Sequence, residues 1–204
     1  MSTDKPSNGN GNGSKEVDDK PAIKKTAKQE LEEKIQELEE KTQSLEGFKF
    51  LEELSRHIDL VRGNASLLAK RIWERGESGD QEFAKKLMCN VGKHDETKFF
   101  GIEWDHLRPG NTNLDLLKQA HAQHVISNPH HPEHWGGMNS MPDIFLAEMV
   151  CDWKSRSDER GSDLRQWIKE FALSKYSISS KGKAYKKIKE YVDLLLDPLF
   201  SKIQ

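Results

Sequence analysis

Histidine is concentrated in one stretch of this chain, which runs from His121 to Asp152. Five of the eight histidines lie within the fourteen residues that end at His134, and Glu148 and Asp152 follow. Histidine is mildly unfavourable in helices and brings no special advantage to an apolar core, so the stretch indicates a metal site, acid–base chemistry or a polar loop. We favour a metal site, since imidazole and carboxylate groups are common ligands of divalent ions.

Composition narrows the class of protein. Hydrophobic residues make up 34% of the 204 and charged residues 32%, which predicts that part of the chain is disordered or solvated helix. The net charge of -2 gives no overall basic footprint for nucleic acid or an anionic membrane. Cys89 and Cys151 form no C-x-x-C pair, so neither a disulfide framework nor a thiolate zinc site is expected. With no secretory-type or membrane-spanning apolar run, we expect a cytoplasmic protein.

The N-terminal part divides into two segments. Residues 1–26 are rich in Gly, Asn, Ser and charge, which predicts a disordered tail. Residues 27–47 are helix formers in which a heptad stripe is flanked by Glu and Lys. The stripe consists of Leu31, Ile35, Leu38, Thr42 and Leu45. Because two to three heptads are marginal alone, this charged helix either pairs with a second copy, giving a homodimer, or is a solvated extension.

The remainder, residues 48–204, is predicted to be one all-α domain. Apolar positions recur with helical spacing, and we find no convincing alternating strand. Residues 99–110 are expected to be an irregular connection, since they contain a Pro-Gly break. The expected helices cover residues 48–73, 80–91, 113–127, 142–157, 163–176 and 183–196. The tryptophans expected in the core are Trp73, Trp104, Trp153 and Trp167.

Several metal-capable side chains fall on the inward, apolar faces of these helices. His57 and His94 each stand three residues after an apolar residue of their helix. His121 and His124 share one face of the next helix, because they are three residues apart. In chain order, the metal-capable residues expected to point inward are His57, His94, Asp95, His124, His130, His131 and Asp152.

This order of residues resembles the HD-domain superfamily of metal-dependent phosphohydrolases. The local sequences look more closely like an uncharacterised HD-like family of bacterial and phage proteins, over about residues 50–200. They read H-D-E-T-K-F, H-V-I-S-N-P-H-H-P-E-H-W and E-M-V-C-D-W. The resemblance implies an HD-domain-like helical bundle that holds one or two divalent metal ions, Mn, Fe, Zn, Ni or Co, with a bridging water or hydroxide.

The resemblance also implies a division of the ligands. The primary site would consist of His57, His94, Asp95 and Asp152. A second ion would be bound by His124 and by one or both of His130 and His131. This chain departs from the dinuclear pattern, because His124 and His130 are only six residues apart with Pro129 between them. The loop histidines could therefore contact substrate instead.

Further residues are candidates for catalysis and substrate binding. Glu103 or Glu148 could act as general base or could orient a ligand. Lys98 and Arg62 could receive a phosphate group, and Trp135 could line a pocket. Each charged member of this set fits an ordinary surface ion pair equally well.

The other histidines have plainer interpretations. His134 fits loop packing beside its neighbour Trp135, and His121 fits a hydrogen-bonded core histidine. His106 is expected to be exposed. Whether His121 and His134 are ligands is left open.

These features favour a divalent-metal-dependent phosphohydrolase that acts on a nucleotide or another small phosphate ester. Two alternatives stay open. The resembled superfamily also includes diiron oxygenases with a similar ligand order. A metal-stabilised helical module without enzymatic activity would also account for the buried ligands and the heptad helix.

Overall fold

The computed structural model describes residues 25–108 and 110–197, in two compact units, residues 1–42 and 43–204. Every regular element in these described residues is a helix and none is a strand, which confirms the all-α prediction. The predicted disordered tail lies outside the described residues, apart from Lys25 and Thr26. Each unit is treated separately below.

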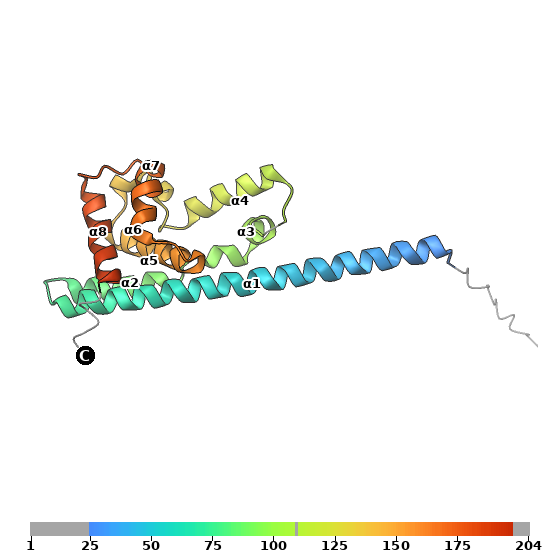
Figure 1. Cartoon of the computed structure of the whole chain (residues 1–204), viewed down its shortest axis with the longest axis horizontal. Helices are drawn as coiled ribbons and strands as arrows, with labels where there is room; N and C mark the ends of the chain where they lie inside the picture. The colour runs from blue at the N-terminus through green and yellow to red at the C-terminus, as the bar shows by residue number, and fades with distance from the viewer. Residues whose placement is uncertain (1–24, 109, 198–204) are drawn as a thin grey trace, which may run out of the picture. The chain divides into compact units, whose positions relative to one another are not determined.

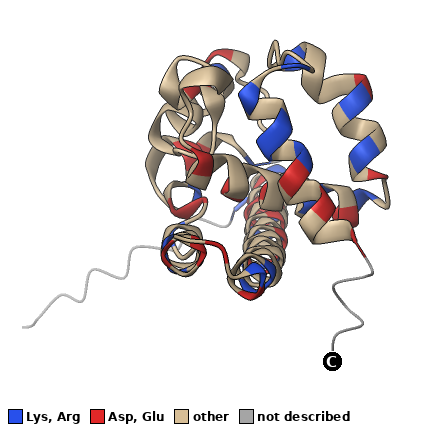
Figure 2. Cartoon of the chain, turned by 90° about the vertical axis from the view of Figure 1, so that its left-hand side faces the viewer, with Lys and Arg blue, Asp and Glu red and all other residues tan. Residues whose placement is uncertain are grey.

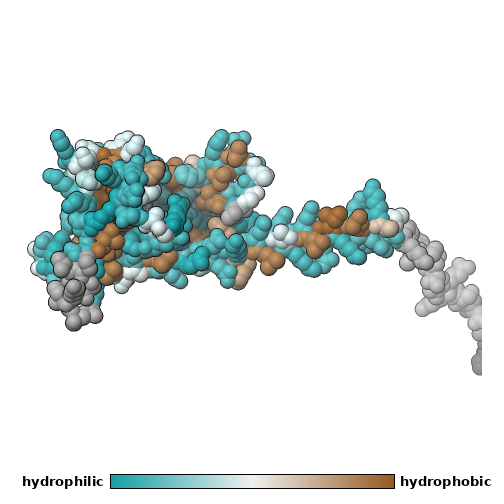
Figure 3. All heavy atoms as spheres, in the orientation of Figure 1, coloured by the Kyte–Doolittle hydropathy of each residue, from teal (hydrophilic) through white to brown (hydrophobic). Residues whose placement is uncertain are grey.

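The first unit contains the beginning of α1, Ala27–Arg75. Thr26 and Gln29 form a reciprocal cap: the Thr26 backbone N–H donates to Gln29 Oε1 at 2.9 Å, and the Gln29 N–H donates to Thr26 Oγ1 at 3.4 Å. This pair starts the helix. Leu31 and Leu38 are 59% and 63% exposed, and Ile35 is exposed as well. Apolar atoms of α1 are visible at the surface in Figure 3.

In the second unit, α1 continues through Gly47, where we predicted a helix end. That prediction was wrong, and packing explains why. A Cβ on the buried Gly47 would lie 3.3 Å from Arg108 Nη1, and the same guanidinium lies 5.5 Å from the Trp104 ring centroid. The absence of a side chain at Gly47 therefore leaves space for the Arg108 side chain beside α1, and the helix continues without a break.

The remaining helices are shown in Figure 1. The α-helices are α2 (Asp80–Val91), α3 (Gly101–His106), α4 (Leu114–Ser127), α5 (Asp143–Arg160), α6 (Leu164–Trp167), α7 (Leu173–Lys175) and α8 (Lys183–Leu196). The 3-10 helices are η1 (Glu96–Phe99), η2 (Pro132–Trp135) and η3 (Met138–Ser140), and η4 (Ile168–Ala172) is a π-helix. The expected irregular connection thus contains α3, which is too short to produce a detectable apolar repeat.

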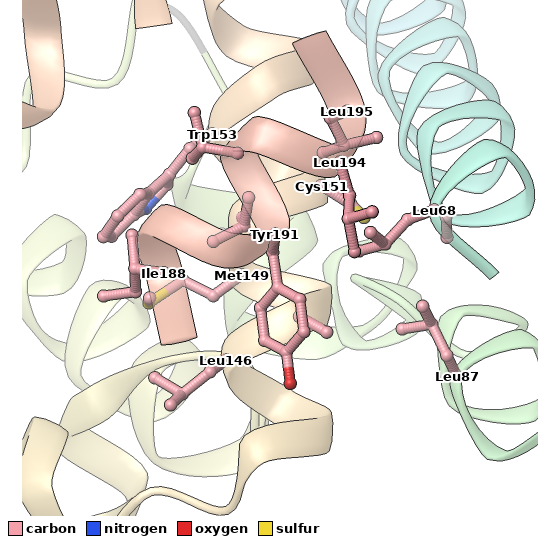
Figure 4. Packing of buried hydrophobic residues seen from close by; sticks show 14 of the residues in the cluster. Leu68, Leu87, Leu146, Met149, Cys151, Trp153, Ile188, Tyr191, Leu194 and Leu195 are labelled. Carbon is pink, nitrogen blue, oxygen red and sulfur yellow. The ribbon is translucent and has the colours of Figure 1, made fainter. Parts of the chain in front are cut away.

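The core surrounds α5, which packs against α2 and α8. Leu146 and Met149 of α5 meet Ile188 of α8 in this core (Figure 4). Leu68 places α1 in the same cluster. This central helix also carries Asp152, the last candidate ligand.

The four tryptophans differ from one another. Trp153 is buried, whereas Trp104 and Trp167 are half-buried. Trp73 is 44% exposed, so its assignment to the core was wrong. On α1 it follows the buried Ile72, which turns the Trp73 side chain about 100° away from the core-facing stripe.

Charged side chains of both signs are interspersed along the helices (Figure 2). Within the described residues, no helix has the length and apolarity needed to cross a bilayer.

Candidate metal centre

Five segments of the second unit bring the candidate ligands together. His57 lies on α1, and His94 and Asp95 follow the end of α2. The last turn of α4 carries His124, and the following loop carries His130 and His131. The α5 helix carries Asp152. All are buried except His131 and Asp152, which are partly exposed.

The first donor group consists of His57, His94 and Asp152. One ligand atom from each residue lies within 4.8 Å of the others. His57 Nε2 is 3.0 Å from Asp152 Oδ1, and His57 Nδ1 is 3.3 Å from Glu159 Oε1. Glu159 was not among the sequence candidates, although it stands seven residues, about two helical turns, after Asp152.

The second donor group consists of Asp95, His124, His130 and His131, again within 4.8 Å of one another. Asp95 Oδ1 is 3.4 Å from His124 Nε2 and 3.5 Å from His130 Nε2. The Nε2 atoms of His124 and His131 are 3.0 Å apart. Three imidazole nitrogens and one carboxylate oxygen thus converge on one small volume.

Glu148 connects the two donor groups. Its Oε1 lies 3.1 Å from His94 Nδ1 and 3.7 Å from His130 Nδ1, and the three residues form a third group of neighbouring donors. A carboxylate that accepts the Nδ1–H of an imidazole leaves Nε2 free as a ligand atom. Glu148 is therefore placed to orient His94.

Glu103 has the equivalent position at His124. Its Oε2 lies 2.8 Å from His124 Nδ1 and accepts a hydrogen bond from Thr97 Oγ1 at 2.9 Å. Asn128 Nδ2 donates to the same Thr97 oxygen at 2.8 Å and to the His124 carbonyl at 2.9 Å. The sequence prediction missed Thr97 and Asn128, because isolated polar residues in loops carry no periodic signal.

Several buried polar atoms of this cluster have no hydrogen-bond partner. Within the described residues, these buried side-chain atoms are His57 Nδ1 and Nε2, His94 Nε2 and Asp95 Oδ1. The contacts of the His57 ring with Asp152 and Glu159 are short but do not have the geometry of hydrogen bonds. Leaving a buried polar group unsatisfied costs about 1–3 kcal/mol, more for charged groups. A divalent cation would satisfy these lone pairs, and nitrogen and carboxylate donors suit such an ion. The residues present therefore fit a metal centre.

Electrostatics keep most of the donors in their metal-binding forms. Burial and the neighbouring Lys98 ammonium lower the pKa of His124 to about 3, and burial lowers the pKa of His130 well below its usual range. Burial raises the pKa of Asp95, but the Lys98 ammonium and His94 outweigh it and hold that pKa well below its usual range. Metals bind neutral imidazole and ionised carboxylate.

The backbone conformation at Asp95 helps to bring His94 and Asp95 into the cluster. Asp95 lies in the left-handed region with φ 56°, one of two described non-glycine residues with positive φ. Aspartate tolerates this conformation better than most residues, and such strain is often found at functional sites. The turn lets both adjacent side chains point into the buried cluster.

A comparison with models of protein families shows to which family the chain belongs. Residues 46–194 match the model of a family of unknown function, DUF5662. The chain belongs to this family. Comparison with curated proteins and with solved structures gave no match. The DUF5662 segment contains every donor from His57 to Asp152 and leaves out most of the heptad helix.

The predicted substrate residues of the DUF5662 segment lie at different places. Lys98 Nζ donates to Asp95 Oδ2 at 2.6 Å, so Lys98 contacts a candidate ligand directly. Arg62 is exposed and donates to the Gly92 carbonyl at 3.0 Å, which joins α1 to the end of α2. Trp135 Nε1 donates to the Pro129 carbonyl at 2.8 Å, which orders the loop that carries His130.

The remaining histidines of the DUF5662 segment lie outside the donor groups. His121 is exposed, so its inward assignment was wrong: α4 buries Ala120, His124 and Val125 instead. His134 is exposed and packs against Trp135, with ring centroids 4.8 Å apart. His106 was expected to be exposed but is half-buried, with its Nδ1 3.0 Å from Asn111 Nδ2.

Proposed function

We propose that the protein is a divalent-metal-dependent phosphohydrolase of the cytoplasm that acts on a small phosphate ester. The observation that carries the proposal is the pair of adjoining donor groups, joined by the consecutive residues His94 and Asp95, with unpartnered buried donor atoms in both. The resemblance of the ligand order to HD-domain phosphohydrolases supports the same reaction. Under this proposal the DUF5662 segment is an HD-like domain.

The chain's own residues would have distinct roles. His57, His94 and Asp152 would hold one ion, and Asp95, His124, His130 and His131 would hold a second. When bound, divalent ions lower the pKa of a water molecule and neutralise charge that develops on a phosphoryl group.

The surrounding residues would position these ligands. Glu148 and Glu103 fix the ring orientations of His94 and His124 through the Nδ1 atoms. Lys98 holds the Asp95 carboxylate ionised, since an ammonium group at 2.6 Å favours the anion. Glu103 Oε2 accepts a hydrogen bond from Thr97 and lies beside His124 Nδ1, so we assign Glu103 a positioning role.

The test combines metal analysis with turnover. The full-length protein is purified, loaded with Mn, Fe, Co, Ni or Zn in turn, and assayed on a panel of nucleotides and sugar phosphates. We expect hydrolysis that is lost in Asp95→Ala and kept in Arg165→Gln, a surface control that pairs with Asp193. Hydrolysis that persists in Asp95→Ala contradicts the proposal. Iron-dependent oxidation with a mixed-valent paramagnetic signal would assign a diiron oxygenase instead.

A further inference from the structure

A cavity of about 230 Å³ adjoins the candidate metal centre and is not explained by metal binding alone. His130, His131 and Asp152 are among the residues that line it. Three basic side chains, those of Arg156, Arg160 and Lys175, line the cavity as well. The lining of the cavity therefore combines candidate metal ligands with cationic side chains.

The basic residues of α5 form an ordered row. Asp152, Arg156 and Arg160 follow at four-residue intervals, which places them on one face of the helix, one turn apart. Arg156 Nη1 donates to Glu159 Oε2 at 2.9 Å. No ion pair to Arg160 is present within residues 25–108 and 110–197. One guanidinium of the row is thus available to an anion.

Three aromatic side chains, those of Trp153, Trp167 and Tyr176, also line the cavity and contact one another. The ring centroid of Trp153 lies 5.2 Å from that of Trp167 and 5.7 Å from that of Tyr176. The π-helical turn Ile168–Ala172 lies between Trp167 and Lys175 in the chain. Such π-helical turns are rare and are frequent at functional sites. Here the turn belongs to the segment 167–176, which supplies Trp167, Lys175 and Tyr176 to the lining of the cavity.

We propose that this cavity binds a second anionic group of the substrate, a phosphate or a carboxylate, while the phosphoryl group to be hydrolysed lies at the metal centre. This inference rests on the proposed function. Guanidinium groups recognise phosphate and carboxylate through paired N–H donors. The volume is below the roughly 300–1,000 Å³ of sites for drug-sized ligands. A substrate of sugar-phosphate size with two anionic groups fits better than a nucleoside triphosphate.

Binding to the metal-loaded full-length protein tests this inference without turnover. Calorimetric titrations compare fructose 1,6-bisphosphate, fructose 6-phosphate and ATP. We expect the bisphosphate to bind at least tenfold more tightly than the monophosphate and more tightly than ATP. In Arg160→Gln this advantage should fall about tenfold, and in Arg165→Gln it should be unchanged. Thermal unfolding verifies that both variants fold.

Two results would overturn the inference: equal affinity for the bisphosphate and the monophosphate, or an Arg160→Gln variant with unchanged affinities. Tighter binding of ATP would refute the size argument. Failure of the proposed function would appear differently, as absence of hydrolysis by the wild-type protein in the assay above, while the binding comparison still reports on the cavity.

The heptad register of α1 in the first unit supports a second, independent inference. Leu31 and Leu38 occupy d positions, and Ile35 and Thr42 occupy a positions. Isoleucine at a with leucine at d favours parallel two-stranded coiled coils. The three apolar side chains are exposed. A second copy of the same helix would cover them.

The flanking charges favour the same arrangement. Lys34 is then at g, and Glu39 is at e of the following heptad. Neither has an ion pair among the residues that the structure describes. In a parallel dimer, g of one helix meets e of the next heptad on the other, so Lys34 would face Glu39 of the second copy on both sides. An antiparallel pair would instead bring like charges together.

We infer that two copies associate through a parallel coiled coil over residues 27–42. Sedimentation equilibrium of the full-length protein should show a dimer at about 100 µM. Ile35→Glu should give a monomer, and Lys34→Glu should weaken the dimer about tenfold. Adding Glu39→Lys to Lys34→Glu should restore it. A wild-type monomer at every concentration, or a dimer that Ile35→Glu leaves intact, would overturn the inference.

Discussion

Two regions of this protein depart from the usual distribution of polar and apolar groups, and they do so in opposite directions. The second unit buries polar atoms without partners, including His94 Nε2 and Asp95 Oδ1. The first unit exposes large apolar side chains, including Leu31 and Leu38. In both regions the chain's own residues leave local interactions incomplete. We propose that a metal ion is the missing partner in the second unit. In the first unit, we propose that the missing partner is a second copy of the chain.

The two departures differ in their effect on stability. A buried polar group without a partner loses hydration on folding, which costs about 1–3 kcal/mol. An exposed leucine is also exposed in the unfolded chain, so it has little effect on the folding equilibrium. Removing the metal should therefore destabilise the second unit, whereas changing the exposed stripe should alter association alone. The predictions below test this contrast.

The largest effect is expected for activity. Asp95→Asn keeps the shape of the side chain but removes the charge that the surrounding histidines and Lys98 face. We expect kcat/KM to fall at least 1,000-fold, or about 4 kcal/mol of transition-state stabilisation. Steady-state assays of the metal-loaded protein measure this. Leu38→Ser, in the exposed stripe, should keep kcat/KM within twofold, and a comparable loss in both variants would break the contrast.

The next effect separates buried from exposed leucines. Leu68 is fully buried in the core, whereas Leu31 is largely exposed. Leu68→Ala should lower the free energy of unfolding by about 2–5 kcal/mol. Leu31→Ala should change it by less than about 0.5 kcal/mol under dilute, monomeric conditions. Chemical denaturation at low micromolar concentration provides the comparison, and equal losses would refute the assignment of Leu31 to the surface.

Metal removal should have a comparable effect on the second unit. Metal at 100 times its Kd stabilises the folded state by about 2.7 kcal/mol. For a domain of this size this corresponds to a fall in Tm of roughly 5–10 °C on chelation. Differential scanning calorimetry with and without chelator measures the shift. The Asp95→Asn variant is the comparison: it should lose the ion held by the second donor group and show a smaller fall in Tm on chelation than the wild type. A wild-type Tm that is indifferent to chelator would contradict metal binding.

A smaller effect comes from a salt bridge that is complete within the chain. The hydrogen bond from Arg75 lowers the pKa of Asp80. A depressed folded-state pKa gives stability that is present above the unfolded pKa, near 3.9, and is lost as pH falls through the folded value. Asp80→Asn should therefore lower the free energy of unfolding by about 1 kcal/mol at pH 7. The difference between the variant and the wild type should vanish at a pH below the folded-state pKa of Asp80. The effect should not depend on chelator.

Part of this architecture could be predicted from the sequence because its signals are long and periodic. Asp80–Val91 and Lys183–Leu196 match the expected helices, since several apolar residues recur on one face. The helix end expected at Gly47 is absent. The glycine is explained by its close packing against the Arg108 side chain and does not end the helix. The short α3 and the π-helical turn gave no periodic signal that could be detected.

The candidate site also contains residues that could be predicted from the sequence and residues that could not. His57 and His94 could be found because a polar side chain on an apolar helical face is unusual. His121 was misassigned, since α4 buries a different face from the one that its leucines indicate. Thr97, Asn128 and Glu159 were missed, because their roles depend on contacts between residues far apart in the sequence.

Metal content measured on the full-length protein tests the central claim most directly. The protein is loaded with excess divalent metal, dialysed against metal-free buffer and analysed by plasma mass spectrometry beside Asp95→Asn and the surface control Arg165→Gln. We predict two ions per chain in the wild type and the control, and at most one in Asp95→Asn. A wild-type protein that retains no metal under every loading condition would contradict the assignment of the buried histidine and aspartate cluster as a metal centre.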